Sequence, residues 1–284
     1  MSWCKPFSSQ EIEHNVFIPS KLTLMVGTSK KTKYEKQEYK AKYQGTKKIL
    51  VVCTDTANMT MANQRIFSTG NHPVETLEPM MHMRDAGFSF DIATVSGGPV
   101  ALEMWAYPTE DENFKNFHEE IRAELESPKV LGDIKNLNDY VGIFIPGGHG
   151  AMINLPTSAA LGKLLHEAHQ KRMPTVVLCH GPAALLSTCC ERINKEFAYD
   201  GYELMCFTDK TDAFSPKLGY MPGLLPWKVQ ESLENKGAKV LNTSETGATH
   251  QDRELITGDS PAAASPLGIM AAPILVKYAN DNNH

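Results

Sequence analysis

The 284-residue sequence has neither an excess of positive charge nor a long apolar run. Its 28 lysines and arginines are outnumbered by 33 aspartates and glutamates, which gives a formal net charge of −5. This balance does not favour nucleic acid or an anionic membrane surface as a partner. No uninterrupted apolar stretch approaches the ~20 residues that cross a bilayer. Residues 22–26, which Thr23 interrupts, are too few to be the apolar core of a secretion signal.

The six cysteines lack the spacing of a disulfide scaffold or a zinc ribbon. No two of them form a CxxC pair, which excludes the common zinc-ribbon and thioredoxin motifs. Cys189 and Cys190 are adjacent, and adjacent cysteines form a disulfide only with strain. We therefore expect reduced thiols and a cytoplasmic protein.

Short apolar runs alternate with amphipathic segments from about residue 47 onward. The β-branched runs predict strands, and the segments between them predict helices. The expected strands are 49–53, 88–95, 140–145, 175–178, 204–208, 238–241 and 254–257, and the expected helices are 73–86, 112–126, 158–170, one from about 182, 227–235 and one ending near 278. This alternation indicates one α/β domain over residues 47–284, with a mostly parallel sheet and helices on both faces.

Residues 1–46 differ from the rest of the chain. They are polar, poor in strand-like runs and carry a basic patch at Lys30, Lys31 and Lys33. We expect an N-terminal extension that packs on the core or at an interface. A partly mobile, solvated arm would have the same composition.

The stretch 175–182 has the layout of a nucleophile elbow. A β-branched run ends in Cys179, and Pro182 marks the first turn of an expected helix. Such a turn exposes the side chain, and the positive end of the helix favours the thiolate, which is the reactive form of cysteine. The alternative is an inert cysteine buried at a strand end.

Two neighbouring features extend this interpretation. His180 can carry protons if a carboxylate holds it, although a histidine at a helix start often only packs or caps. The loop 146–150, Pro-Gly-Gly-His-Gly, offers backbone N–H groups to an oxyanion, although glycines also mark ordinary tight turns. In a parallel sheet both loops lie at the carboxyl ends of strands, where ligands bind.

Glu75 has a structural explanation in the sequence. With His72 as the N-cap of the helix 73–86, Glu75 occupies the third helical position, which acidic residues take in a capping box. Nothing in the neighbouring residues assigns it a chemical role.

Five segments together resemble the PfpI-type superfamily of cysteine-dependent hydrolases and glyoxalases. They are similar in particular to its HchA branch, whose members are known as glyoxalase III, protein deglycase and heat-shock holding chaperone. The matching segments are 67–76, 144–150, 178–184, 219–223 and 255–261, spread over most of the chain beyond residue 48. The resemblance implies a flavodoxin-like α/β sandwich and a homodimer.

The resemblance assigns roles to four side chains. Cys179 would be the nucleophile, Glu75 would hydrogen-bond its sulfur and move protons, and His180 would be the third catalytic group. Asp212 falls where the family orients that histidine with an acid, and Asp209 is close by in the sequence. The role of the orienting acid therefore has two candidates.

The implied reaction also uses backbone groups. The N–H groups of Gly148 and His149, with that of His180, would bind the oxyanion formed when Cys179 attacks an aldehyde. We expect glutathione-independent conversion of a small 2-oxoaldehyde, methylglyoxal, to lactate, with deglycase activity on glycated proteins. No redox cofactor is expected, because the neighbouring ketone oxidises the aldehyde.

A departure from the branch concerns its metal site of two histidines and a glutamate. The matching positions here are Arg84, Ser89 and about Ile121, none of which is a good transition-metal ligand. His82 and His118 lie near in the sequence, where a histidine on a helix face is the simpler interpretation. We therefore expect no metal at these positions.

Two other functions agree with the same residues. A stress-induced holding chaperone would bind unfolded proteins through an apolar patch, with Cys179 as a redox sensor; the run Met80, Met81 and Met83 is a candidate patch, although a helical core is its more common fate. A cysteine amidase or peptidase would use the same elbow to form an acyl-enzyme. A small closed pocket would argue against peptides.

Overall fold

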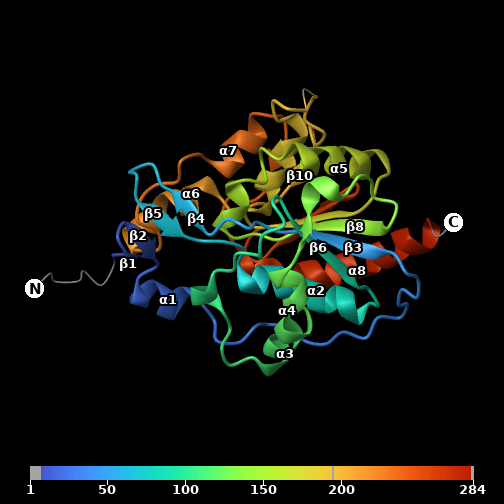
Figure 1. The fold of residues 1–284 in the computed structure, drawn as a ribbon, viewed down its shortest axis with the longest axis horizontal. Helices are drawn as coiled ribbons and strands as arrows, with labels where there is room; N and C mark the ends of the chain where they lie inside the picture. Colours follow the sequence, from blue (N-terminus) through green and yellow to red (C-terminus); the bar gives the residue numbers. More distant parts are fainter. Residues whose placement is uncertain (1–7, 194, 283–284) are drawn as a thin grey trace, which may run out of the picture.

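A seven-stranded sheet forms the centre of the computed structural model, which describes residues 8–193 and 195–282 (Figure 1). Neighbouring strands are parallel, except for the antiparallel pair β12–β13 at one edge. In spatial order the strands are β12 (Thr249–Asp252), β13 (Leu255–Gly258), β9 (Thr175–Leu178), β8 (Tyr140–Ile145), β3 (Lys48–Val52), β6 (Phe90–Thr94) and β7 (Lys129–Val130). The predicted mostly parallel α/β sheet is confirmed.

The central strands are buried on both faces, as their continuous apolar sequences require. Every residue of β8 and β9 is buried. Because side chains alternate along a strand, Leu50 and Val52 of β3 enter one apolar core, and Ile49 and Val51 enter the other. The sheet therefore separates two apolar layers.

Helices cover both faces of the sheet, as predicted (Figure 1). The side chains of one core come from α2, α3, α4 and α8, and those of the other from α5, α7 and the 3₁₀ helix η4. Their bounds are α2 (Pro73–Asp85), α3 (Glu112–Glu120), α4 (Arg122–Glu126), α5 (Ala159–Gln170), η4 (Gly181–Cys189), α7 (Val229–Glu234) and α8 (Ala264–Asp281). Met80, Met81 and Met83 of α2 are fully buried, so this run forms core and no surface patch.

The N-terminal extension contains strands, contrary to the sequence prediction. β1 (Gln10–Glu13) and β2 (Val16–Ile18) join β5 (Ile66–Ser68) and β4 (Asn58–Thr60) in a second sheet of order β1-β2-β5-β4. These strands are short and partly exposed, so their sequences lack an apolar signal, and their partner β5 lies about fifty residues away. Residues 1–7 of the predicted extension lie outside the described residues.

Further contacts tie the extension to the body of the molecule. Helix α1 (Lys21–Gly27) follows Ser20, whose N–H donates to the Gly219 carbonyl at 2.8 Å. Lys30 of the basic patch pairs with Glu110 at 2.6 Å, and the Tyr34 hydroxyl donates to Asp85. The described part of the extension is therefore packed on the core.

Four elements differ from their predictions. The expected helix 112–126 is interrupted at Ile121, which separates α3 from α4. The helix after Cys179 is the 3₁₀ helix η4 instead of an α-helix. The runs 204–208 and 238–241 form only β10 (Glu203–Leu204) and β11 (Lys239–Val240), which pair with each other in a separate two-stranded sheet.

The remaining elements are short. They are α6 (Asp209–Phe214) and the 3₁₀ turns η1 (Met104–Ala106), η2 (Leu131–Asp133), η3 (His149–Met152), η5 (Ser215–Leu218) and η6 (Pro261–Ala263). Helix α8 with η6 is, among the described residues, long and apolar enough to cross a membrane by length and composition alone. However, 56% of its most apolar window is buried, and it packs beside α2 under the sheet (Figure 1).

Candidate active site

Cys179 lies at a sharp turn directly after β9, as the elbow prediction requires. Its φ of +59° is a left-handed conformation that residues other than glycine seldom adopt and that often marks functional turns. Two backbone hydrogen bonds hold the turn. The Cys179 N–H donates to the Gly258 carbonyl at 2.9 Å, and the Cys179 carbonyl accepts from the Phe207 N–H at 2.9 Å.

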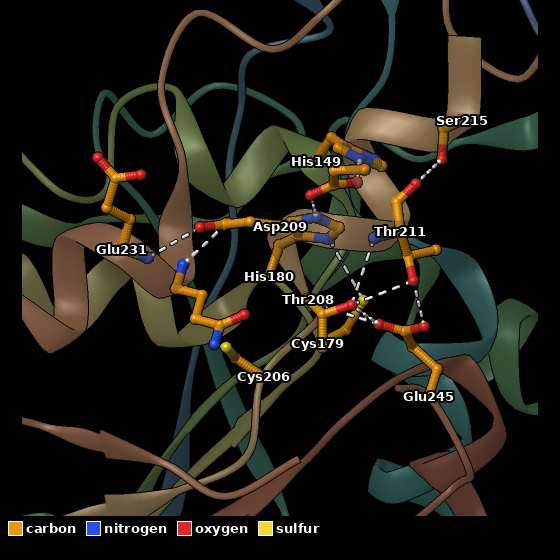
Figure 2. Close-up of polar contacts among 12 residues, drawn as sticks. His149, Cys179, His180, Cys206, Thr208, Asp209, Thr211, Ser215, Glu231 and Glu245 are labelled. Atoms are coloured by element: carbon orange, nitrogen blue, oxygen red, sulfur yellow. Dashed lines mark hydrogen bonds and ion pairs between the residues drawn. The ribbon is translucent and has the colours of Figure 1, made fainter. Parts of the chain in front are cut away.

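Cys179, His180 and Asp212 form a continuous hydrogen-bonded chain (Figure 2). The Cys179 Sγ lies 3.3 Å from His180 Nδ1, and His180 Nε2 lies 2.9 Å from Asp212 Oδ2. Burial alone would raise the pKa of Asp212, but the charges of His180 and His149 and the hydrogen bonds from both hold that pKa well below its usual range. An ionised Asp212 accepts the Nε2–H of His180 and leaves Nδ1 as the base that faces the sulfur.

The structure separates the two acids that the sequence left as alternatives. Asp212 faces His180, whereas the Asp209 carboxylate accepts the backbone N–H groups of Gln230 at 3.1 Å and Glu231 at 2.9 Å, at the start of α7 (Figure 2). Asp209 therefore acts as a helix cap.

The helix that carries Asp212 is fixed at its start. Thr208 is the N-cap of α6, and its N–H and hydroxyl both donate to Glu245 Oε1, at 2.9 and 2.6 Å. The Thr211 hydroxyl donates to the other oxygen of Glu245 at 2.6 Å (Figure 2). These hydrogen bonds to Glu245 anchor the first turn of α6, the helix that carries Asp212.

His149 makes a side-chain contact that the sequence analysis missed. Its Nε2 lies 3.0 Å from Asp212 Oδ1, and its ring centroid lies 4.0 Å from that of His180. The sequence drew attention to this residue only for its backbone. The motif Pro-Gly-Gly-His-Gly pointed to this loop, but Asp212, the partner of the His149 imidazole, lies 63 residues later in the chain.

Glu75 does not form the capping box that its position suggested. The His72 N–H donates to the Gly147 carbonyl at 3.1 Å, and the His72 side chain makes no capping hydrogen bond. The Glu75 carboxyl lies instead beside Cys179, because Glu75 Oε2 and Cys179 Cβ border the same point at Gly147, and each group shifts the pKa of the other. Glu75 Oε2 is buried with no hydrogen-bond partner among the described residues. Burial raises the pKa of Glu75 well above its usual value.

The electrostatic environment of Cys179 is opposite to the one expected from a helix start. Burial raises the pKa of the thiol well above its usual value, the neighbouring Glu75 carboxyl adds to this rise, and the backbone N–H of Gly148 opposes it only partly. The resting sulfur therefore carries its proton. It becomes a nucleophile only when that proton moves to a neighbouring base.

The glycine loop brings the reacting groups close together. A Cβ on Gly147 would lie 2.0 Å from Glu75 Oε2 and 2.6 Å from Cys179 Cβ, so only glycine fits between them. Gly148 has φ +92°, and its N–H favours the charged forms of both Cys179 and Glu75. The His149 N–H faces the Glu103 carboxylate instead. The oxyanion roles of Gly148 and His149 stay predictions.

The site is closed. The five side chains Glu75, His149, Cys179, His180 and Asp212 are each 1–4% exposed. Phe207 stacks on His180 with centroids 4.8 Å apart, and the partly buried Tyr220 has its ring centroid 5.9 Å from that of His149. A second buried acid, Glu103, has its pKa raised by burial to about 7 and accepts the Thr69 hydroxyl at 2.5 Å. This environment fits a small substrate.

Two groups of residues are candidates for a metal site. His149, His180 and Asp212 offer ligand atoms within 4.8 Å of one another, but these atoms are already hydrogen-bonded to each other, so we assign no metal there. The positions that match the HchA metal ligands, Arg84 among them, all line one cavity of about 280 Å³. In this cavity the Arg84 guanidinium pairs with Glu120 at 3.1 Å.

The surroundings of this cavity do not fit a transition metal. Arg84 also pairs with Asp85 at 3.3 Å and lies over the Phe117 ring. His82 is hydrogen-bonded to the Ser265 hydroxyl at 2.9 Å, and His118 to the Tyr107 hydroxyl at 2.9 Å. The Arg84 guanidinium, a fixed positive charge, therefore occupies the place that a metal cation would take. His82 and His118 are hydrogen-bonded to hydroxyl groups.

The fold and site define an α/β protein with a cysteine at a nucleophile elbow, beside a histidine, an aspartate and a glutamate. The chain belongs to the DJ-1/PfpI family, whose model matches residues 66–203. It is 44% identical over 271 residues to the protein/nucleic acid deglycase HchA of Pseudomonas aeruginosa strain UCBPP-PA14, with 93% of each chain covered. It is 41% identical over 272 residues to HchA of Escherichia coli O157:H7 strain EC4115, with 94% of this chain and 95% of the relative covered.

Solved structures share the fold. The Rapid Encystment Protein 24 kDa of Francisella tularensis is 22% identical with a TM-score of 0.69, and the match covers 81% of this chain and 99% of that one. Glyoxalase III of Candida albicans is 22% identical with a TM-score of 0.63, and the match covers 80% and 97%. At this level of identity the likeness concerns the fold alone.

Proposed function

We propose that this chain is a cysteine-dependent, glutathione-independent glyoxalase and deglycase of the HchA type, which converts 2-oxoaldehydes such as methylglyoxal to 2-hydroxy acids. One observation carries the proposal: the buried Cys179 sulfur lies 3.3 Å from His180 Nδ1, and the buried Glu75 carboxyl lies beside the same cysteine, next to Gly147. The names of the HchA relatives support the deglycase part.

The first step is addition of sulfur to the aldehyde. The Cys179 proton passes to His180 Nδ1 as the sulfur bonds to the aldehyde carbon, and Asp212 stabilises the imidazolium. The carbonyl electron pair moves to oxygen, where the Gly148 N–H can bind it. Glu75, whose raised pKa keeps it protonated, gives that oxygen a proton. The product is a hemithioacetal.

The second step moves a hydrogen between carbons. The Glu75 carboxylate removes the hydrogen of the former aldehyde carbon, and His180 protonates the ketone oxygen, which gives an enediol. Glu75 then returns its proton to the second carbon while the hydroxyl on the first carbon loses its proton to His180. The aldehyde carbon has become a thioester, and the ketone has become an alcohol.

Hydrolysis ends the cycle. His180 passes its proton to Glu75 and then activates a water, which attacks the thioester carbon. The C–S bond breaks, the sulfur recovers a proton, and the hydroxy acid leaves. The aldehyde carbon is oxidised and the ketone carbon reduced, so the reaction needs no external oxidant.

The test is lactate formation from methylglyoxal in the absence of glutathione. We expect activity in the wild type, none in Cys179→Ala, and full activity in the control Cys190→Ser, because Cys190 is a free thiol outside the site. A wild type that forms no lactate, or a Cys179→Ala variant that stays active, contradicts the proposal. Lysine adducts of methylglyoxal on a carrier protein, followed by mass spectrometry, test the deglycase part.

The proposal extends to the setting of the enzyme. The described cysteines are free thiols, which agrees with a cytoplasmic protein, and we propose a homodimer that light scattering of the purified chain can test. The closed site disfavours a peptidase. The net charge of −5 offers no general attraction for nucleic acid, so protein adducts and free 2-oxoaldehydes are the substrates proposed here.

A further inference from the structure

Asp212 holds two histidines, one on each carboxylate oxygen. His180 Nε2 lies 2.9 Å from Oδ2, and His149 Nε2 lies 3.0 Å from Oδ1. All three side chains are at most 4% exposed. The two rings have centroids 4.0 Å apart and planes inclined by 36°, so they stand side by side against one acid.

The carboxylate determines the tautomer of both rings. An ionised aspartate only accepts hydrogen bonds, so each Nε2 carries a hydrogen and each Nδ1 of a neutral ring is a free base. For His180 that base faces the Cys179 sulfur. His149 lies outside this path, because it reaches the sulfur only through Asp212 and His180.

His149 is itself held from several sides. Its ring meets the Phe67 ring at 79° with centroids 5.7 Å apart. Tyr220 contacts the ring from another side, at 5.9 Å. Because these contacts fix the imidazole, it can in turn fix the carboxylate that it touches.

We propose that His149 is a positioning residue, which holds Asp212 in place for His180 from the second carboxylate oxygen and divides the negative charge of Asp212 between two donors. The inference rests on the proposed function and adds to it a side chain that acts through another residue. It also links the glycine loop, which carries the Gly148 N–H, to the acid of the catalytic chain.

The proposal predicts the direction in which the pH profile of kcat/KM moves when His149 is replaced. Without His149, Asp212 is bound by one partner only, so its charge stabilises the His180 imidazolium more strongly. Since His180 must be neutral to accept the thiol proton, the acid limb of kcat/KM moves to higher pH. Besides His180, the titratable groups that interact electrostatically with His149 or Asp212 include His72, Glu103, Cys179, Cys206, Asp209 and Tyr220, and Glu75 lies beside Cys179.

The first experiment compares His149→Phe, which keeps a ring but has no donor, with His149→Gln, which can keep an N–H near the Nε2 position. For His149→Phe we expect kcat to fall by about 10- to 100-fold with little change in KM, and the acid limb to move to higher pH. His149→Gln should restore most of kcat. His118→Phe, on α3 and outside the site, is the control. An unmoved acid limb in His149→Phe, or an equal loss in both variants, overturns the proposal.

A second experiment needs no substrate, so it distinguishes this inference from the proposed function. The rate of Cys179 alkylation by iodoacetamide is measured against pH in the wild type, His149→Phe, Asp212→Asn and the double variant. If His149 acts through Asp212, His149→Phe shifts the profile in the wild-type background and adds little in the Asp212→Asn background. Additive shifts overturn the proposal. If circular dichroism shows that His149→Phe does not fold, the same cycle is run with His149→Gln. We then expect a smaller shift of the profile that vanishes in the Asp212→Asn background. An additive shift overturns the proposal.

Discussion

The Cys179 Sγ and His180 Nδ1 atoms lie 3.3 Å apart, although the two residues are neighbours in the chain. Neighbouring side chains usually diverge, and here the backbone turns sharply at Cys179, whose φ is +59°. Asp212 then holds the far side of the imidazole at 2.9 Å. The strained turn and the contact between the Cys179 sulfur and the His180 imidazole therefore occur at the same two residues.

Gly147→Ala should abolish activity with a smaller effect on folding. The new Cβ would lie 2.0 Å from Glu75 Oε2 and 2.6 Å from Cys179 Cβ, so the two reacting groups must separate. We expect kcat/KM to fall by at least about 100-fold and the free energy of unfolding to fall by about 1–3 kcal/mol. Lactate assays and urea titrations measure both. Gly132→Ala, where a Cβ meets nothing within 4 Å, is the control and should change neither.

Asp212 and Asp209 should differ sharply when substituted. Asp212→Asn disturbs the tautomer of His180, and we expect a loss in kcat of about 100- to 10,000-fold. Asp209→Ala removes the cap of α7, which should lower the free energy of unfolding by about 1 kcal/mol and leave most of kcat. Steady-state kinetics measure kcat, and thermal melts measure stability, for both variants. Equal losses of activity would show that the two acids are not functionally distinct.

The buried acid Glu78 should make stability fall as pH rises. Burial raises its pKa to about 7 in the folded chain, so between pH ~4.5 and 7 the folded state binds more protons than the unfolded state. Relative to Glu78→Gln, the wild type should lose about 2 kcal/mol of unfolding free energy between pH 5 and pH 8. Urea titrations at both pH values measure the difference. A constant difference would mean that the folded pKa is not raised.

Chelation should leave the activity unchanged. The cavity that matches the HchA metal site holds the Arg84 guanidinium, paired with Glu120 at 3.1 Å and Asp85 at 3.3 Å. Dialysis against EDTA, followed by the lactate assay and metal analysis of the protein, tests this. A loss of activity that zinc restores would locate a functional metal elsewhere in the chain.

Much of the central sheet could be predicted because its strands are continuous apolar runs. The predicted strand 140–145 coincides with β8, and 175–178 with β9. The strands β1 and β2 were missed because they are short and partly exposed, and β2 becomes a strand by pairing with β5 from a distant part of the chain. Hydrogen bonds between distant segments leave no periodic trace in the local sequence.

Some residues of the candidate site could likewise be predicted from local sequence, and others could not. Cys179, His180 and the loop with Gly148 lie in contiguous motifs that end strands, so residue order alone points to them. Glu75 was assigned a role only by resemblance, because its local sequence reads as a helix cap. The choice of Asp212 over Asp209 depended on where α6 is anchored, by Thr208 and Glu245.

The sequence by itself determined the alternation of strands and helices and the elbow with its cysteine, because apolar runs and turn residues act over a few neighbouring positions. Only the tertiary structure decided that the imidazole of His149 shares Asp212 with His180. It also decided that the Cys179 thiol keeps its proton at rest, since burial beside the Glu75 carboxyl outweighs the effect of the helix start. Burial and charge at this site are set by side chains that lie far apart in the chain, and folding alone brings them together.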